Sequence, residues 1–222
     1  MNTLTETQVR LFASAQSWIE GEAVRQLYAT VRLDGIRCAV GFPDLHPGKG
    51  TPIGAAFLTE DVIYPHLIGG DIGCGMALFA TDLVRREVKL DRWAALRFDL
   101  EHPWDEFVSD FIAEHDLEST EFDYGLGTIG GGNHFAELQA VEKVIDPDAF
   151  RKIGLGKQQL AVLVHSGSRG LGESVLRDHV DQHFANSVET ESFAAGEYLR
   201  GHDLATRWAK ANRELKTRKQ TR

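Results

Sequence analysis

The chain has 222 residues, of which 42% are hydrophobic and 26% are charged, and its formal net charge is −9 at pH 7. This length allows one large globular domain or two small ones, with enough apolar residues for a proper core. The acidic balance argues against unspecific nucleic-acid binding through bulk charge, so a nucleic-acid substrate would need a local basic groove.

Cysteine content and apolar runs indicate the compartment. The chain has two cysteines, Cys38 and Cys74, which are too few for a disulfide framework and favour a reducing cytoplasm. Cys38 lies within the apolar run 36–40, where we expect a small buried thiol. We expect no signal peptide and no membrane span, because no apolar run has the length or position that either would need.

The first 90 residues are predicted to form one helix followed by strands. The helix begins near Ser17, because Ser17 and Glu20 have the spacing of a capping box and apolar residues follow at helical spacing. Asp34-Gly35 then turns the chain into a strand, and an unusual loop follows at 43–50. The predicted strands are 36–40, 53–58, 62–64 and 76–81.

The rest of the chain mixes helices with two strands. Helices are predicted at 90–98, 104–115, 173–184 and 197–212, and strands at 135–141 and 160–164. The last residues, 216–222, are basic and polar, and we expect them to pack against nothing. No internal repeat or inter-domain linker is evident, so we predict one domain.

A glycine-rich segment, 68–75, lies between two predicted strands and carries Asp71 and Cys74 three residues apart. Glycine allows positive φ and close approach, so the carboxylate and the thiol can point at the same spot. A hard oxygen and a soft sulfur that converge suggest a metal ion. The alternative is a glycine turn beside an unrelated buried cysteine.

A second glycine cluster, 130–132, precedes Asn133 and His134 at the head of a strand. Consecutive glycine amides can form a concave nest for phosphate, and an imidazole beside it would be a metal ligand or an acid/base. Asn133 and Glu137 are the donor and acceptor types needed to grip a nucleotide. The alternative is a flexible hairpin loop with a surface histidine.

A third turn follows His165, which ends an apolar strand, and leads through 166–170 into a helix. The helix N-terminus favours an anion, and Arg169 adds a planar fork for phosphate. A core histidine satisfied by backbone is the alternative for His165. The four candidate metal ligands are Asp71, Cys74, His134 and His165. A metal beside phosphate-binding backbone suggests phosphoryl chemistry, with two ions if a thiolate bridges them.

Two further residue pairs that contain histidine carry weaker signals. Asp44 and His46, on a proline-flanked loop, fit a general base with its partner, or a turn cap. His179 and His183 are one helical turn apart without the acidic partner of a zinc helix, so we expect them on a helix surface.

Four motifs in order resemble the signatures of the RtcB RNA-splicing ligases. They are Pro43-Asp44-Leu45-His46, Gly70-Asp71-Ile72-Gly73-Cys74-Gly75, 127–135 and 165–172. The segments around the first two are most similar to the release-factor-H-coupled branch. The resemblance implies an α+β fold of RtcB type, with β-sheets flanked by helices and active-site loops at strand ends. It implies a single catalytic domain over 1–222 that is incomplete at its C-terminus.

The family joins RNA 3′-phosphate or 2′,3′-cyclic phosphate ends to 5′-hydroxyl ends with GTP and Mn²⁺, in RNA repair and tRNA splicing. The resemblance implies that Asp71, Cys74 and His134 hold one Mn²⁺, and that Cys74 bridges to a second one held by His165. It also implies a GMP site lined by Asn133, His134, Phe135, Ala136 and Glu137. The implied catalytic residues are Asp44, Cys74 and Asn133.

One departure from the family is large. In the family, another metal-binding histidine and the histidine that takes GMP lie well downstream of the motif that corresponds to 165–172. No remaining histidine of this chain fits either position. We therefore expect a truncated, catalytically deficient ligase acting on ends of broken or spliced RNA, such as tRNA or rRNA. The alternatives are a non-catalytic module that binds metal, nucleotide or RNA ends, and a metallo-phosphodiesterase that opens cyclic phosphates.

Overall fold

The computed structural model describes residues 8–14, 16–89, 91, 101–104, 108–184 and 187–220. The chain forms two compact units, one of Met1–Leu67 with His183–Glu197 and the other of Ile68–Gln182 with Tyr198–Arg222. Both sheets and helices are present, which confirms the expected α+β class. The single domain expected over 1–222 stays a prediction.

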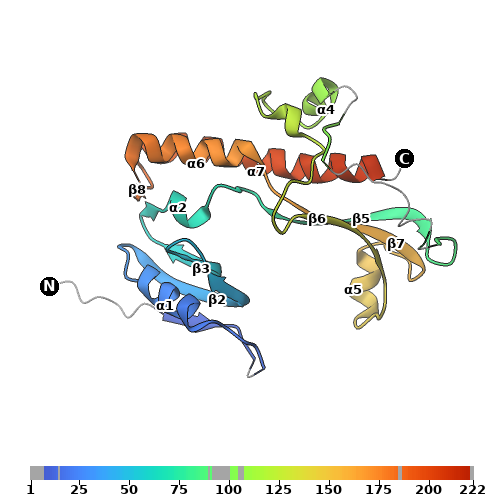
Figure 1. Cartoon of the computed structure of the whole chain (residues 1–222), viewed down its shortest axis with the longest axis horizontal. Helices are drawn as coiled ribbons and strands as arrows, with labels where there is room; N and C mark the ends of the chain where they lie inside the picture. Colours follow the sequence, from blue (N-terminus) through green and yellow to red (C-terminus); the bar gives the residue numbers. More distant parts are fainter. Residues whose placement is uncertain are drawn as a thin grey trace. The chain divides into compact units, whose positions relative to one another are not determined.

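The first unit contains a three-stranded sheet in the order β1-β2-β3 (Figure 1). Its strands are β1 (Gln8–Leu11), β2 (Ile36–Pro47) and β3 (Pro52–Thr59), with β1 parallel and β3 antiparallel to β2. Helix α1 (Gly21–Thr30) lies against this sheet, and its apolar side chains form a small core with those of β2. The buried members of that core are Ala23, Leu27, Ala39 and Leu45.

Two predictions for this unit need correction. Helix α1 begins at Gly21, and Glu20 caps it without a side-chain hydrogen bond. Ser17 is not part of a capping box, because its hydroxyl contacts the hydroxyl of Ser14 at 3.0 Å. The predicted loop 43–50 is largely strand, since β2 continues to Pro47 across a register shift between Gly41 and His46.

A short ladder and a short helix complete the first unit. Strand β4 (Val62–Ile63) pairs with β8 (Val188–Glu189) in an antiparallel ladder, and helix α2 (Pro65–Ile68) follows β4 directly. Cys38 is half-buried rather than buried, because its neighbour on the central strand β2, Ala39, points into the core and Cys38 therefore points to the opposite face of the sheet.

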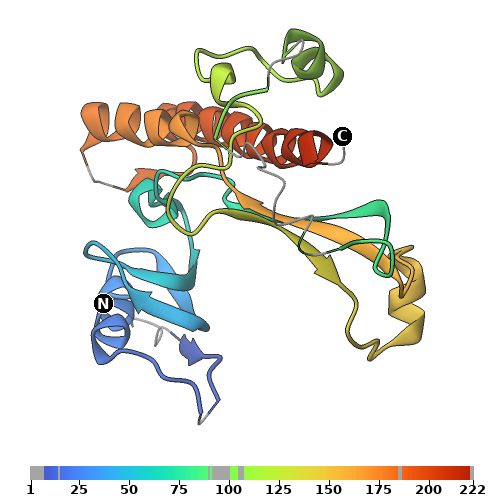
Figure 2. The ribbon, with the colours of Figure 1, turned by 45° about the vertical axis from the view of Figure 1, so that its right-hand side comes forward.

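The second unit contains a three-stranded antiparallel sheet in the order β5-β7-β6 (Figure 2). Its strands are β5 (Gly75–Val84), β6 (Phe135–Ala140) and β7 (Gln159–Ser166), and helix α5 (Pro147–Lys152) lies between β6 and β7 in the sequence. Strand β7 is central and apolar, so Val162 and Val164 are buried against Ile129.

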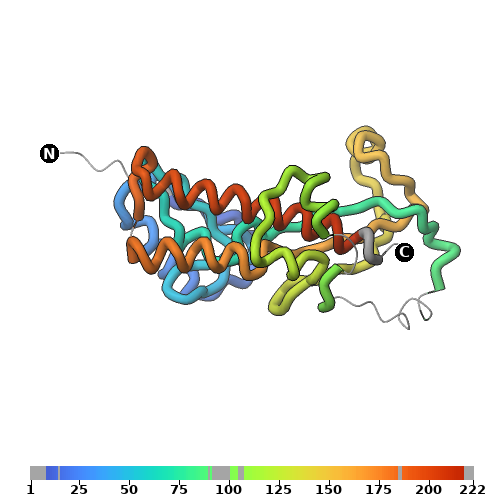
Figure 3. Tube along the Cα trace, turned by 90° about the horizontal axis from the view of Figure 1, so that it is seen from above, coloured from blue at the N-terminus to red at the C-terminus, as the bar shows by residue number. Residues whose placement is uncertain are grey.

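Helices α6 (Gly170–His183) and α7 (Phe193–Gln220) run side by side (Figure 3). The 28-residue α7 packs with α4 (Val108–Glu114) and the 3₁₀ turn η1 (Asp123–Gly125) around Trp208, which is fully buried. The indole Nε1 of Trp208 donates to Asp123 at 3.0 Å, so the ring is both packed and hydrogen-bonded.

The second unit corrects three further predictions. Helix α6 begins at Gly170, three residues before the predicted start. His179 is buried and packs its ring against Tyr198, because α7 covers the helix face that we expected to be exposed. Lys216, expected to pack against nothing, is only 1% exposed.

The predicted helix 90–98 lies outside the described residues, except Asp91. Within the described part of 104–115, helix α4 begins at Val108. Among the described residues, no helix is long and apolar enough to cross a membrane.

Candidate metal centre

Strand register brings the three candidate motifs of the second unit to one end of its sheet. Met76 of β5 and Phe135 of β6 both lie opposite His165 of β7. Cys74 comes directly before β5 and His134 directly before β6, while His165 is near the end of antiparallel β7. The side chains of Cys74, His134 and His165 therefore meet at the same end of the sheet.

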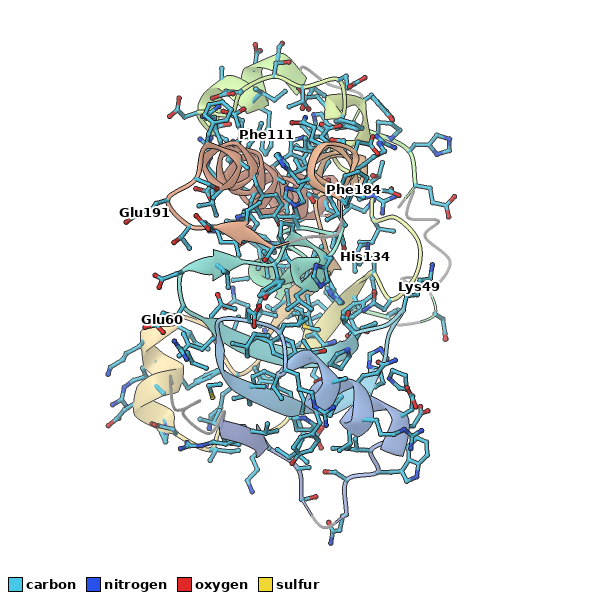
Figure 4. The ribbon with its side chains drawn as sticks, turned by 90° about the vertical axis from the view of Figure 1, so that its left-hand side faces the viewer. Lys49, Glu60, Phe111, His134, Phe184 and Glu191 are labelled. Carbon is cyan, nitrogen blue, oxygen red and sulfur yellow. The ribbon has the colours of Figure 1, made fainter. Side chains whose placement is uncertain are left out.

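The distances show this convergence. The Sγ atom of Cys74 lies 3.1 Å from Nε2 of His165 and 3.5 Å from Nε2 of His134, whose imidazole is labelled in Figure 4. The three ligand atoms are all within 4.8 Å of one another. Asp71 joins them, because its Oδ2 lies 2.8 Å from Nε2 of His134 and its carboxylate hydrogen-bonds the Cys74 thiol.

The turn that carries Asp71 and Cys74 is closed by a hydrogen bond from the Cys74 amide to the Asp71 carbonyl at 3.0 Å. The Asp71 carboxylate then lies against Gly167 of the 165–172 motif. A Cβ atom at Gly167 would come within 2.1 Å of Asp71 Oδ1, so only glycine leaves room for the carboxylate. This close approach brings the glycine turn 68–75 against the turn that follows His165.

The main chain orients His134. Its Nδ1 lies 3.0 Å from the carbonyl oxygen of Ile129. A carbonyl oxygen can only accept a hydrogen bond, so Nδ1 must carry the proton and donate it. In the neutral ring this leaves the Nε2 lone pair on the side of Asp71 and Cys74, which is the tautomer that a metal needs. Without an ion, the 2.8 Å contact between Nε2 and Oδ2 of Asp71 requires a shared proton, which a bound metal would replace. The His134 side chain is 6% exposed, whereas that of Asp71 is 39% exposed, so the site opens on the carboxylate side.

The pKa shifts of His165 and Cys74 have opposite consequences for cation binding. Desolvation and the neighbouring His134 lower the pKa of His165, which keeps its imidazole neutral. Desolvation and the hydrogen bond that the thiol donates to the Asp71 carboxylate raise the pKa of Cys74 to about 11, while the charge of Arg213 opposes this rise. Cys74 is therefore a thiol at neutral pH, and a metal ion that binds its sulfur must release a proton.

The donor set fits a divalent transition metal. It combines one carboxylate, one sulfur and two imidazole nitrogens, and His134 is already held by the outer hydrogen bond typical of metal-binding histidines. Zn²⁺ has the higher intrinsic affinity for such donors, so selection of Mn²⁺ would depend on geometry and supply.

A cavity of about 440 Å³ lies beside the glycine loop that leads to His134. Its walls include Gly130, Gly131 and Arg169, the guanidinium of which lies directly against Gly130. Tyr124 also lines the cavity, and it could not be predicted because an isolated tyrosine in an acidic connection belongs to no recognisable pattern. An arginine fork beside exposed glycine amides can bind a phosphate.

The predicted GMP-site residues divide between the two faces of β6. The Phe135 ring packs edge-on against His165 with a centroid distance of 5.4 Å, and Asn133 and Glu137 are exposed. Ala136 packs with the buried cluster around Ile129, so a contact with GMP would involve its backbone.

Asp44 belongs to the first unit and is exposed on β2, where its carbonyl contacts Nδ1 of His46 at 2.7 Å. Its catalytic role stays a prediction.

Sequence reasoning missed the polar residues on the inner face of α7. Asn212, Arg213 and Lys216 are buried against the loops that carry the candidate ligands. The available signal was their position in line with Trp208, Ala209 and Leu215, which places polar groups within an apolar helix face.

Known proteins are similar to this chain over the segments that build this centre. A family model described as tRNA-splicing ligase RtcB matches residues 26–122 and 110–221. RNA-splicing ligase RtcB2 of Escherichia coli is 43% identical over 208 residues, which cover 91% of this chain and 54% of the relative. The tRNA-splicing ligase RtcB of Archaeoglobus fulgidus is 31% identical over 73% of this chain and 44% of its own length.

The RNA-splicing ligase RtcB of Mycobacterium bovis is 30% identical over 86% of this chain and 60% of the relative. The chain thus spans about half the length of the curated relatives that it matches. The family model covers most of the 222 residues, including all four motifs. The chain therefore belongs to the RtcB family.

Proposed function

We propose that this chain is the metal- and RNA-end-binding part of an RtcB-type ligase. The complete activity would join RNA 3′-phosphate or 2′,3′-cyclic phosphate ends to 5′-hydroxyl ends with GTP and Mn²⁺, in cytoplasmic RNA repair or tRNA splicing. The observation that carries the proposal is the meeting of Asp71, Cys74, His134 and His165 at one edge of the β5-β7-β6 sheet. The names of the matched relatives support the same activity.

In this proposal Asp71, Cys74 and His134 hold one Mn²⁺, and Cys74 and His165 hold the second. Bound ions would stabilise the negative charge that develops on phosphate oxygens. The chain's own residues do the rest. Arg169 and the neighbouring glycine amides orient the phosphate, and residues 133–137 hold GMP.

Asp44 is proposed as an acid/base group of the active site. We expect the 222-residue chain alone to form no covalent GMP adduct, because no histidine matches the family's guanylylated position.

A binding experiment tests the metal and RNA-end functions. Fluorescent oligoribonucleotides that end in 2′,3′-cyclic phosphate, 3′-phosphate or 3′-hydroxyl are titrated with the chain, with and without Mn²⁺. We expect Mn²⁺-dependent binding that favours the phosphate ends and is lost in Cys74→Ser and His134→Ala. Equal affinity for all three ends, or binding that ignores Mn²⁺, would contradict the proposal.

Incubation with labelled GTP tests the covalent step, and an adduct on this chain would overturn the expected deficiency. The second candidate, a metallo-phosphodiesterase, draws support from the exposed side of Asp71, where a metal-bound water could reach a cyclic phosphate. Opening of the cyclic phosphate by the chain with Mn²⁺ and no GTP would favour it. Binding without opening would favour the non-catalytic module.

A further inference from the structure

The inner face of α7 carries buried polar side chains where an apolar core would be expected, and three of them reach the loops of the candidate metal centre. Asn212, Arg213 and Lys216 are 0%, 7% and 1% exposed. Burial of two cationic groups and an amide is costly unless each finds partners, so their partners indicate why the helix has them. Those partners are the backbone groups of the glycine turns around the candidate metal centre.

Asn212 and Lys216 hold the turn that leads to His134. The Gly127 amide donates to Oδ1 of Asn212 at 2.8 Å, and Nζ of Lys216 donates to the Gly127 carbonyl at 2.9 Å. Nδ2 of Asn212 donates to the Thr128 carbonyl at 3.1 Å. The start of this glycine turn is therefore fixed to α7 on both sides of Gly127.

Arg213 ties the other two turns to each other. Its Nη1 donates to the carbonyl of Gly73 at 2.9 Å and to the carbonyl of Ser166 at 2.5 Å. Gly73 directly precedes Cys74, and Ser166 directly follows His165. One guanidinium nitrogen thus joins the main chain beside the thiol to the main chain beside the imidazole.

The charge of Arg213 acts in two opposite directions. It is close enough to Cys74 to favour the thiolate, and for the same reason it repels a divalent cation. Its two hydrogen bonds, by contrast, only favour metal binding, because both hold the two ligand-bearing turns at a fixed spacing. Loss of an outer partner of this kind typically weakens metal binding about 10- to 100-fold.

We propose that Arg213 is a positioning residue of the metal centre, which sets the spacing between Cys74 and His165 through the carbonyls of Gly73 and Ser166. The inference rests on the metal site of the proposed function. In this inference, α7 holds the ligand side chains close together in the absence of a bound ion. Loss of the side chain lets the two turns separate, and divalent-ion affinity falls.

The test is a titration of the chain with Co²⁺ alone, followed by the absorption of the cobalt–thiolate bond, and by competition with Mn²⁺. Arg213→Met removes the donors and the charge, Arg213→Gln keeps amide donors without charge, and Arg213→Lys keeps charge and donors. Lys210→Met is the matched control, since Lys210 is exposed on the same helix. Urea unfolding of each variant confirms that the folded state is being titrated.

We expect Arg213→Met to raise the Co²⁺ dissociation constant about 10- to 100-fold and to weaken the thiolate band. Arg213→Gln and Arg213→Lys should lie between this variant and the parent, and Lys210→Met should match the parent. If Arg213→Met does not fold, the other two variants decide by the same comparison. Parental or tighter binding in the folded variants would show that charge repulsion dominates, and would overturn this inference alone. A parent chain that binds neither Co²⁺ nor Mn²⁺ would overturn the proposed function as well.

Discussion

Ser166 and His134 donate hydrogen bonds to the same acceptor, the carbonyl oxygen of Ile129, from Oγ at 3.1 Å and from Nδ1 at 3.0 Å. Asn212 in turn donates to the Ser166 hydroxyl at 3.2 Å. A continuous chain of hydrogen bonds therefore runs from α7 through a buried serine to the imidazole that faces the candidate metal position. The orientation of His134 depends on groups that never touch the ion.

The first prediction concerns this chain. Ser166→Ala leaves Asn212 without one acceptor and the Ile129 carbonyl with one donor fewer. We expect a loss of about 1–3 kcal/mol in the free energy of unfolding, measured in urea. Ser174→Ala is the control, because that hydroxyl also donates to a backbone carbonyl, Leu171, but away from the centre. Co²⁺ affinity should fall in the first variant and stay unchanged in the second, and equal affinities would argue against the orienting role.

The second prediction concerns the close approach of Gly73 to α7. Gly73 has φ of +73°, and a Cβ there would lie 2.9 Å from Thr206 Cα and 3.0 Å from the Ala209 methyl. Gly73→Ala should therefore cost about 1–3 kcal/mol of unfolding free energy through strain and overlap. Gly131→Ala is the matched control, since a Cβ there meets open space. Equal stability of the two variants would show that the Gly73 turn can move off the helix.

The third prediction is a pH dependence. Burial raises the pKa of Tyr198 to about 12, above its usual value of 10.0, and its hydroxyl has no hydrogen-bond partner among the described residues. The folded state therefore holds this proton more tightly than the unfolded state, so the contribution is fully present below pH 10 and is lost as the pH rises toward 12.

The corresponding measurement compares the parent with Tyr198→Phe in urea at a series of pH values from 8 to ~11.5. The stability of the variant relative to the parent should be constant below pH 10 and should rise above it, because the phenylalanine cannot ionise. Parallel curves over the whole range would mean that the phenol ionises as easily in the folded chain.

The fourth prediction separates phosphate binding from metal binding. Arg169→Ala should weaken binding of an oligoribonucleotide 3′-phosphate about tenfold or more and leave Co²⁺ affinity unchanged, since a charge-assisted hydrogen bond to phosphate contributes about 1.5–3 kcal/mol. Arg177→Ala, an exposed arginine of α6, is the control for general charge loss. If both substitutions weaken binding equally, the cavity beside Gly130 has no special role.

Much of the strand framework could be predicted from the sequence, because its signals are local. Predicted strands at 53–58, 62–64 and 160–164 correspond to β3, β4 and β7, with ends shifted by two residues at most. Runs of β-branched and apolar residues between glycine turns carry this information without reference to the rest of the chain. The α+β class was expected from the family resemblance.

The contacts of the helices could not be predicted in the same way. Ser17 and Glu20 had the spacing of a cap, but Ser14 competes for the serine hydroxyl. Lys216 looks like a residue of a solvated tail, and Arg213 lies just past the predicted helix 197–212. Nothing in a sequence shows that their partners are backbone carbonyls some 90 and 140 positions away. Every residue has a backbone carbonyl, so the partner of a side chain that binds one cannot be identified from residue types.

The candidate centre lies between these cases. The residue types and the glycine turns pointed to Asp71, Cys74, His134 and His165, and the antiparallel register of β5, β7 and β6 explains their proximity. What the residue types could not supply is the second layer on α7, which determines the separation of the turns.

This layer has a practical consequence for anyone who would shorten the protein or graft its site elsewhere. A fragment cut before Asn212 would retain every candidate ligand, and a transplanted set of the three loops would reproduce them all. Neither would contain the helix segment that braces those loops, so the smallest portable binding unit extends about fifty positions beyond the last ligand, His165.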